Sequence, residues 1–205
     1  MRPTTPGHAV LARTELPSDT LLLARFLIGK IVVRETPAGT LTGRIVETEA
    51  YPVGDAASHA FRGATARNRT LFGHRGLAYV YQAYGISWMF NVSSEADGIG
   101  AGVLVRALEP LAGIPAMQRH RGTLALRDLT RGPGRLAMAF DIDRRLDGTD
   151  LCREGPLWLA RDNDAQGAID IATSVRIGIT RDADRPLRFH VRGNRFVSGT
   201  RAMNT

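Results

Sequence analysis

This sequence contains few of the residues that cross-link or anchor a protein. Cys152 is its only cysteine, so an intramolecular disulfide and a cysteine-based zinc or iron–sulfur site are excluded, and a reducing cytosol is the simplest location. The longest apolar stretch, Leu21 to Val33, is interrupted by Arg25 and Lys30, which excludes a membrane span. The N-terminus has no apolar core of signal-peptide length. We therefore expect a cytoplasmic protein that is not secreted and has no membrane partner.

Lysine is almost absent as well. Lys30 is the one lysine among 27 basic residues, so the other 26 are arginines, a bias that a GC-rich genome would also produce. Because acidic residues number only 20, the formal net charge is +7 and the isoelectric point is near 10.6. This charge is high for a small metabolic enzyme, and it favours a polyanionic partner such as nucleic acid.

Length and composition predict one folded domain that spans residues 1–205. The chain has 205 residues, of which 43% are apolar and 23% are charged, and this excludes an intrinsically disordered protein. A chain of this mass buries about 70% of its surface on folding, so it needs neither a disulfide nor a metal for stability.

Hydrophobic periodicity predicts a mixture of helices and strands. Ser18 can cap a first helix whose apolar stripe ends near Gly29. Further helices are expected over residues 111–120 and 135–140, and strands over 31–34, 41–51, 77–94, 101–109, 156–160, 174–180 and 187–192. Connections of hairpin length between the middle strands favour antiparallel pairing. The expected fold is an α+β domain with a curved, largely antiparallel β-sheet flanked by helices.

Two glutamates mark the end of the strand over residues 41–51. The two-residue period of a strand places Glu47, Glu49 and Tyr51 on one face. Two carboxylates this close repel each other unless a cation or water lies nearby, and such a setting can tune one of them as a general base. From this segment alone, an exposed edge strand with ordinary solvated glutamates is the simpler explanation of the pattern.

The segment over residues 77–91 predicts a hairpin with an aromatic residue at its tip. Tyr79 and Tyr81 share a face, whereas Tyr84 breaks the alternation and is followed by Gly85, which suits a bend. Tyr84 can fold back onto the sheet, or it can act as a wedge between bases of a nucleic acid. A two-residue turn places Tyr81 and Asn91 on opposite faces, and a three-residue loop or a bulge places them on the same face.

Arginines and a histidine supply further candidates. Arg106 interrupts an apolar strand, so it needs a carboxylate or several carbonyl groups as partners. His59 lies in the irregular segment 52–76, together with the basic cluster of Arg67 and Arg69. The glycine-rich stretch 130–135, with arginines at positions 131 and 135, precedes a helix and suits a phosphate. Each of these loops can equally be an ordinary polar surface.

Several short motifs in this order resemble one known family. They are Glu47-Thr48-Glu49-Ala50-Tyr51, Ala66-Arg67-Asn68-Arg69, Tyr79-Val80-Tyr81 with Tyr84-Gly85, Asn91-Val92-Ser93-Ser94, Val105-Arg106-Ala107-Leu108-Glu109-Pro110, Gly132-Pro133, Arg176-Ile177-Gly178, Pro186-Leu187-Arg188-Phe189 and Val191-Arg192-Gly193. Each motif is weak alone, but the ordered set covers nearly the whole chain. The sequence resembles the alkyladenine DNA glycosylases, the 3-methyladenine DNA glycosylases of the methylpurine type.

The resemblance implies a monofunctional base-excision-repair enzyme without lyase activity. Such an enzyme flips alkylated or deaminated purines out of duplex DNA and hydrolyses the N-glycosidic bond. By this resemblance Glu49 is the general base, and Arg106 and the carbonyl group of Ile177 help to hold the attacking water. No metal or organic cofactor is implied. The partner would be double-stranded DNA with damaged purines, and we expect a nucleoid-associated monomer.

The resemblance also implies a set of substrate contacts. Tyr51, His59 and Tyr81 would form the walls of a pocket that stacks on the extruded base, and Asn91 would border it and influence purine discrimination. Tyr84 would enter the minor groove and fill the gap in the duplex. We expect Arg67, Arg69, Arg131 and Arg135 to contact DNA phosphates. A non-catalytic DNA-damage-binding protein and a small-molecule nucleosidase are the alternative functions.

Overall fold

The computed structural model describes residues 8–163 and 167–204. In this part of the chain the α-helices are α1 (Thr20–Leu27), α2 (Ile114–Arg121) and α3 (Pro133–Ala139). The strands are β1 (Ile31–Thr36), β2 (Gly39–Tyr51), β3 (Ala78–Ala83), β4 (Ser87–Ser93), β5 (Gly102–Ala112), β6 (Leu157–Ala160), β7 (Ile171–Ser174) and β8 (Arg188–Val191). Short 3-10 helices cover Arg13–Glu15, Arg69–Phe72, Leu126–Asp128, Arg144–Leu146 and Arg201–Met203.

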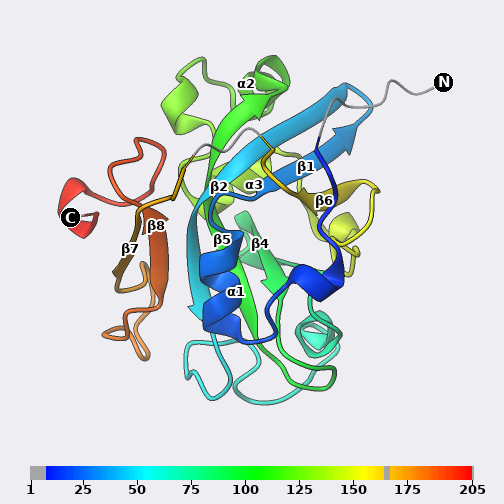
Figure 1. Cartoon of the computed structure of the whole chain (residues 1–205), viewed down its shortest axis with the longest axis vertical. Helices are drawn as coiled ribbons and strands as arrows, with labels where there is room; N and C mark the ends of the chain where they lie inside the picture. The colour runs from blue at the N-terminus through cyan, green and yellow to red at the C-terminus, as the bar shows by residue number, and fades with distance from the viewer. Residues whose placement is uncertain (1–7, 164–166, 205) are drawn as a thin grey trace.

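The strands of the described residues form one curved antiparallel sheet (Figure 1). Its order is β3-β4-β5-β2-β1-β6, and β8, which also pairs with β7, lies beside the second half of β2. The long strand β2 pairs with β1 through residues 39–44 and with β8 through residues 47–49, while β5 follows its other edge. The predicted α+β fold with a curved, largely antiparallel sheet is therefore confirmed.

An irregularity in the pairing of β2 with β5 lies beside the two glutamates. Glu47 is opposite Ala107, whereas the neighbouring Val46 and Arg106 have no partner in register. An extra residue of this kind bends a strand and redirects a side chain. Here it lets the Arg106 side chain reach the carboxylates of β2 while the adjacent residues of β5 stay in the apolar core.

Helix α1 packs against strands β2 and β5 of the sheet (Figure 1). Its buried stripe includes Leu23 and Leu27, which belong to the main apolar core together with residues of the central strands. The prediction that Ser18 caps this helix is wrong. Asp19 is the N-cap, because its carbonyl group accepts the first helical hydrogen bond and its side chain accepts one from the Leu22 amide.

Two expected elements have different bounds. The prediction of a strand over 174–180 is wrong. The strand in this region, β7, ends at Ser174, where its pairing with β8 ends, and the chain then turns toward the end of β2. The helix expected over 111–120 begins only at Ile114, since β5 continues in register with β2 as far as Ala112. Among the described residues, no helix is long and apolar enough to cross a membrane.

Candidate active site

A cavity of about 530 Å³ opens where the β3–β4 hairpin and the ends of β2 and β5 meet two loops. This volume lies within the usual range for a small-molecule pocket. Its lining includes most of the candidate residues: Tyr51, His59, Tyr81, Tyr84, Asn91, Arg106 and Ile177, with Tyr79, Met89, Leu104 and residues 178–181 between them. The fold therefore brings together side chains from across the chain.

Glu49 lies directly behind this cavity rather than in its wall. Its side chain is fully buried, and its Oε1 accepts one hydrogen bond from the Ile177 amide at 2.7 Å. The same oxygen forms an ion pair with Nη1 of Arg106 at 3.2 Å. Glu49 Oε2 accepts one hydrogen bond from the Tyr51 hydroxyl at 2.9 Å. Because Tyr51, Arg106 and Ile177 all line the cavity, the carboxylate is one side-chain layer from the space that a ligand would occupy.

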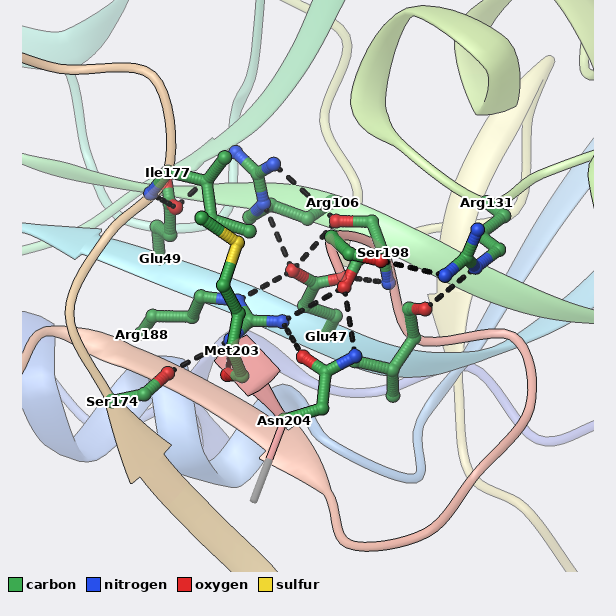
Figure 2. Close-up of polar contacts among 12 residues, drawn as sticks. Glu47, Glu49, Arg106, Arg131, Ser174, Ile177, Arg188, Ser198, Met203 and Asn204 are labelled. Atoms are coloured by element: carbon green, nitrogen blue, oxygen red, sulfur yellow. Dashed lines mark hydrogen bonds and ion pairs between the residues drawn. The ribbon is translucent and has the colours of Figure 1, made fainter. Parts of the chain in front are cut away.

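Arg106 links this carboxylate to a second one (Figure 2). Its Nε donates to Glu47 Oε1 at 3.0 Å, so of the two expected kinds of partner, a carboxylate or several carbonyl groups, the carboxylate is the observed one. Burial disfavours its charge, but Glu49 and Glu47 together raise the pKa of Arg106 above its ordinary value. The guanidinium therefore stays charged in the interior.

Aromatic rings form one wall of the cavity. The ring centroids of His59 and Tyr81 are 4.3 Å apart, and those of Tyr79 and Tyr81 are 5.3 Å apart with nearly parallel planes. A base between two rings needs a separation of about 7 Å, twice the contact distance of carbon atoms. His59 and Tyr81 therefore act as parts of the same wall, and a base cannot enter between them without a rearrangement.

The ionisation of these rings follows from their burial. Burial and the nearby Glu49 raise the pKa of Tyr51 and of Tyr81, so both phenols are neutral at physiological pH. Burial and Arg67 lower the pKa of His59, whose Nδ1 is 3.0 Å from the Tyr79 hydroxyl. The aromatic wall therefore carries no charge of its own near neutral pH.

Tyr51 is held from behind by a buried ion pair. The guanidinium carbon of Arg176 lies 4.6 Å from the centroid of the Tyr51 ring. Arg176 forms an ion pair with the fully buried Asp55 and also donates to the Ala50 carbonyl at 3.0 Å. These contacts fix the tyrosine whose hydroxyl binds Glu49.

The hairpin has the register in which Tyr81 and Asn91 share a face. Ala83 pairs with Ser87, which leaves a three-residue loop, and Asn91 lies directly opposite Tyr79. The Asn91 side chain donates to the Tyr79 carbonyl at 3.1 Å, which holds the amide at the cavity. Of the two open alternatives, the three-residue loop is the observed one.

Tyr84 is at the tip of this hairpin and is 92% exposed. Its φ of 52° is in the left-handed region, which is uncommon for a residue with a large side chain. Gly85 follows with a φ of 69°, and the adjacent Ile86 is also exposed. The alternative in which Tyr84 folds back onto its own sheet is wrong.

Comparison with known proteins decides the family. The model for the family described as Methylpurine-DNA glycosylase (MPG) matches residues 14–195. The chain belongs to this family. A relative from Mesorhizobium japonicum is 66% identical over 196 residues, covering 96% of this chain and 93% of the relative. One from Paraburkholderia phytofirmans is 49% identical over 193 residues, covering 94% and 90%, and both are named "Putative 3-methyladenine DNA glycosylase".

The resemblance seen in the sequence motifs is thus confirmed. This methylpurine-DNA glycosylase is a DNA N-glycosylase, a repair enzyme for alkylated purines, and its substrate is DNA. Among the described residues, no group of three or more His, Cys, Asp and Glu side chains has the arrangement of a metal site.

The expected phosphate-binding arginines of this glycosylase have different surroundings. Arg67 and Arg69 are exposed, and Arg67 borders a second hollow of about 420 Å³ that shares His59 with the main cavity. Arg131 instead donates to the carbonyl groups of Val197 and Gly199 at 2.8 and 2.6 Å. Arg135 pairs with Asp128 at 2.8 Å on the surface. Arg67 and Arg69 are therefore better placed than Arg131 and Arg135 to contact DNA phosphates.

Sequence reasoning missed some residues of this glycosylase site. Tyr79 belongs to the aromatic wall although it is not among the predicted site residues, and its alternation with Tyr81 is the signal that could have found it. The pairing of Asp55 with Arg176 has no local signal, although Arg176 is part of a family motif, because the two residues are 121 positions apart. Strand alternation places Glu47 beside Glu49, but no sequence pattern indicates which groups balance its charge.

Proposed function

We propose that this methylpurine-DNA glycosylase hydrolyses the N-glycosidic bond of an extruded purine with a water molecule activated by Glu49. The observation that carries the proposal is the buried Glu49 carboxylate, oriented by Ile177 and Arg106 directly behind an aromatic cavity. A protein that only binds DNA gains nothing from a desolvated carboxylate near a polyanion. Catalysis explains why the charge is kept there.

The reaction passes through a sugar with oxocarbenium character, so the site must place a water and stabilise positive charge at the anomeric carbon. A positioned carboxylate serves both needs, and general-base help contributes about 10²–10⁴-fold to the rate. Glu49 Oε1 already accepts from the Ile177 amide and forms an ion pair with Arg106, whereas Oε2 accepts only from Tyr51 within the described residues. Oε2 is therefore the oxygen that we assign to the water, which Arg106 and the Ile177 carbonyl would help to hold.

The cavity suits a purine that has been methylated at N3 or N7. Such a base carries positive charge and leaves readily, so it does not need a strong general acid. The neutral rings of Tyr51 and Tyr81 present electron-rich faces, which attract a cationic base. Asn91 at the border of the cavity would contribute to the choice among purines. Base release from duplexes that each carry one defined lesion measures the preference among alkylated and deaminated bases.

The nucleotide must leave the base stack to reach this cavity. Extrusion costs a few kcal/mol, and stacking on aromatic side chains contributes about 1–3 kcal/mol per base. The exposed Tyr84 is suited to fill the vacated gap in the duplex, with Arg67 and Arg69 on neighbouring phosphates. Because one chain supplies every element of this arrangement, we propose that the enzyme acts as a monomer.

We further propose that the enzyme has no lyase activity. A lyase needs an amine that attacks the abasic sugar, and Lys30 is the only lysine. Its Nζ lies 4.7 Å from the centroid of the Phe26 ring, and the residue does not line the cavity.

The decisive experiment is a base-release panel on duplexes that each carry one lesion: 3-methyladenine, 7-methylguanine, hypoxanthine or ethenoadenine. Release of free base from at least one duplex, with an intact abasic strand, supports the proposal. Binding without release would support the damage-binding alternative. Equal release from free nucleosides and from DNA would support a nucleosidase.

A further inference from the structure

Behind the proposed general base lies a second buried carboxylate, Glu47, which accepts four hydrogen bonds (Figure 2). Glu47 Oε1 accepts from Arg106 Nε at 3.0 Å, from Arg188 Nε at 2.7 Å and from the Ser198 hydroxyl at 2.9 Å. Its Oε2 accepts from the Ser198 amide at 2.7 Å. The Coulombic attraction of the two arginines lowers the pKa of Glu47 despite its burial, so it is an anion.

Arg188 is committed to this second carboxylate and to the C-terminal segment. Besides Glu47, its guanidinium donates to the Ser174 hydroxyl, the Ser198 and Met203 carbonyl groups and Asn204 Oδ1, at 2.6–3.1 Å. Glu49 is not among its partners. Arg188 therefore balances the charge of Glu47, and Arg106 is the only one of the two arginines that also reaches Glu49.

The orientation of Arg106 follows from these contacts. Glu47 holds its Nε, and the Ser198 hydroxyl accepts from its Nη2 at 3.3 Å, which leaves Nη1 facing Glu49. Arginine otherwise prefers to grip a carboxylate with two parallel hydrogen bonds. Without Glu47, the guanidinium could turn two N–H groups to Glu49 and cover the oxygen that we assign to the water.

We propose that Glu47 is a positioning residue for base release: with Ser198, it holds Arg106 so that only one of its nitrogens contacts Glu49. The inference rests on the proposed role of Glu49. A buried ion pair is by itself a weak source of stability. A positioning role explains why the charges of Glu47 and Arg188 are nevertheless buried behind the site. Ser198 comes from the segment after β8, so this segment contributes to catalysis without touching the substrate.

The test compares three full-length variants in single-turnover release of 7-methylguanine from methylated duplex DNA. Glu47→Gln removes the charge that holds Arg106, and Ser198→Ala removes a hydroxyl that contacts both Glu47 and Arg106. Asn204→Ala is the matched control, because it removes hydrogen bonds to Arg188 and to the Ser198 carbonyl but none to Arg106. For each variant, the rate at saturating enzyme, the half-saturating enzyme concentration and the Tm are measured.

We expect Glu47→Gln to lower the saturating rate at least about tenfold and Ser198→Ala at least about threefold. The half-saturating concentration should change less than about twofold in both, and Asn204→Ala should keep the wild-type rate even if its Tm falls. If Glu47→Gln does not fold, Ser198→Ala carries the test, because its backbone amide still binds Glu47.

The inference is overturned if the two variants keep the wild-type rate. It is also overturned if Asn204→Ala loses as much rate as Ser198→Ala at an equal loss of Tm, since the cluster would then act only through stability. Failure of the proposed function looks different, because the wild-type enzyme would then release no base.

Discussion

The amide of Ile177 donates to the buried Glu49 carboxylate at 2.7 Å, across 128 positions of sequence. The loop after β7 therefore orients Glu49, the proposed general base, from the side of the cavity. The family resemblance implied a role for the Ile177 carbonyl in holding water, and that role stays a prediction. The hydrogen bond from the Ile177 amide to Glu49 also holds this loop in place before substrate binds.

Replacement of Glu49 by Gln should abolish catalysis without abolishing DNA binding. The amide keeps the shape of the side chain but cannot take a proton from water, so we expect base release to fall at least about a hundredfold. Release is measured under single-turnover conditions, and binding by titration of lesion DNA. Glu109→Gln is the matched control, because Glu109 is part-exposed, pairs with Arg44 and does not line the cavity. Retained activity of the Glu49 variant would remove this residue from its proposed role.

The hydroxyl of Tyr51 can be tested separately from its ring. Tyr51→Phe keeps the stacking surface but loses the hydrogen bond to Glu49 Oε2. A hydrogen bond of this kind contributes about 1 kcal/mol, so the single-turnover rate should fall about fivefold while lesion affinity is retained. Tyr51→Ala should lower both quantities. Equal behaviour of the two variants would argue against a separate contribution of the hydroxyl.

Tyr84→Ala tests the wedge. Loss of the exposed ring should weaken capture of a lesion in duplex DNA by about 1–3 kcal/mol. A single-stranded substrate needs no gap filled, so its processing should change less. Ile86→Ala is the control on the same loop, because this side chain is 83% exposed. An equal loss of lesion capture on duplex and single-stranded substrates would contradict the proposal that Tyr84 fills the gap in the duplex.

Incubation of the enzyme with lesion DNA and borohydride tests the absence of lyase chemistry. No reduced enzyme–DNA adduct should form, because Lys30 packs on Phe26 outside the cavity. A known bifunctional glycosylase serves as the positive control. A trapped adduct that disappears in Lys30→Arg would show that the only lysine acts as a nucleophile.

The buried His190 predicts a loss of stability in mild acid. Burial and the nearby Arg188 lower the pKa of His190 in the folded protein below its value of about 6.5 in the unfolded chain. As the pH falls below about 6.5, the unfolded state therefore takes up a proton that the folded state resists, and the free energy of unfolding decreases. Denaturant unfolding between pH 7.5 and 5.5 measures this slope. His190→Phe should reduce this slope without removing it, because the pKa of His59 is lowered by burial as well. An unchanged slope would assign it to other groups.

Much of the fold could be predicted because local periodicity and turn chemistry agree with it. The strand alternation correctly placed Glu47 and Glu49 on one face, and Gly85 correctly indicated the hairpin bend. The bounds that failed depend on pairing. The chain leaves the sheet after Ser174 although its apolar residues continue, because Arg176 turns to Asp55 and Ile177 to Glu49.

The sequence alone determined the family, the charge that suits DNA, and the identity of the candidate side chains, because these depend on residue types in a fixed order. Only the tertiary structure decided how the charges are paired. The two glutamates of β2 meet partners from distant segments: Arg106, Arg188 and Ser198. These contacts depend on an irregularity in strand register and on the course of the chain after β8. Geometry at this scale comes from packing between segments, which no local pattern encodes.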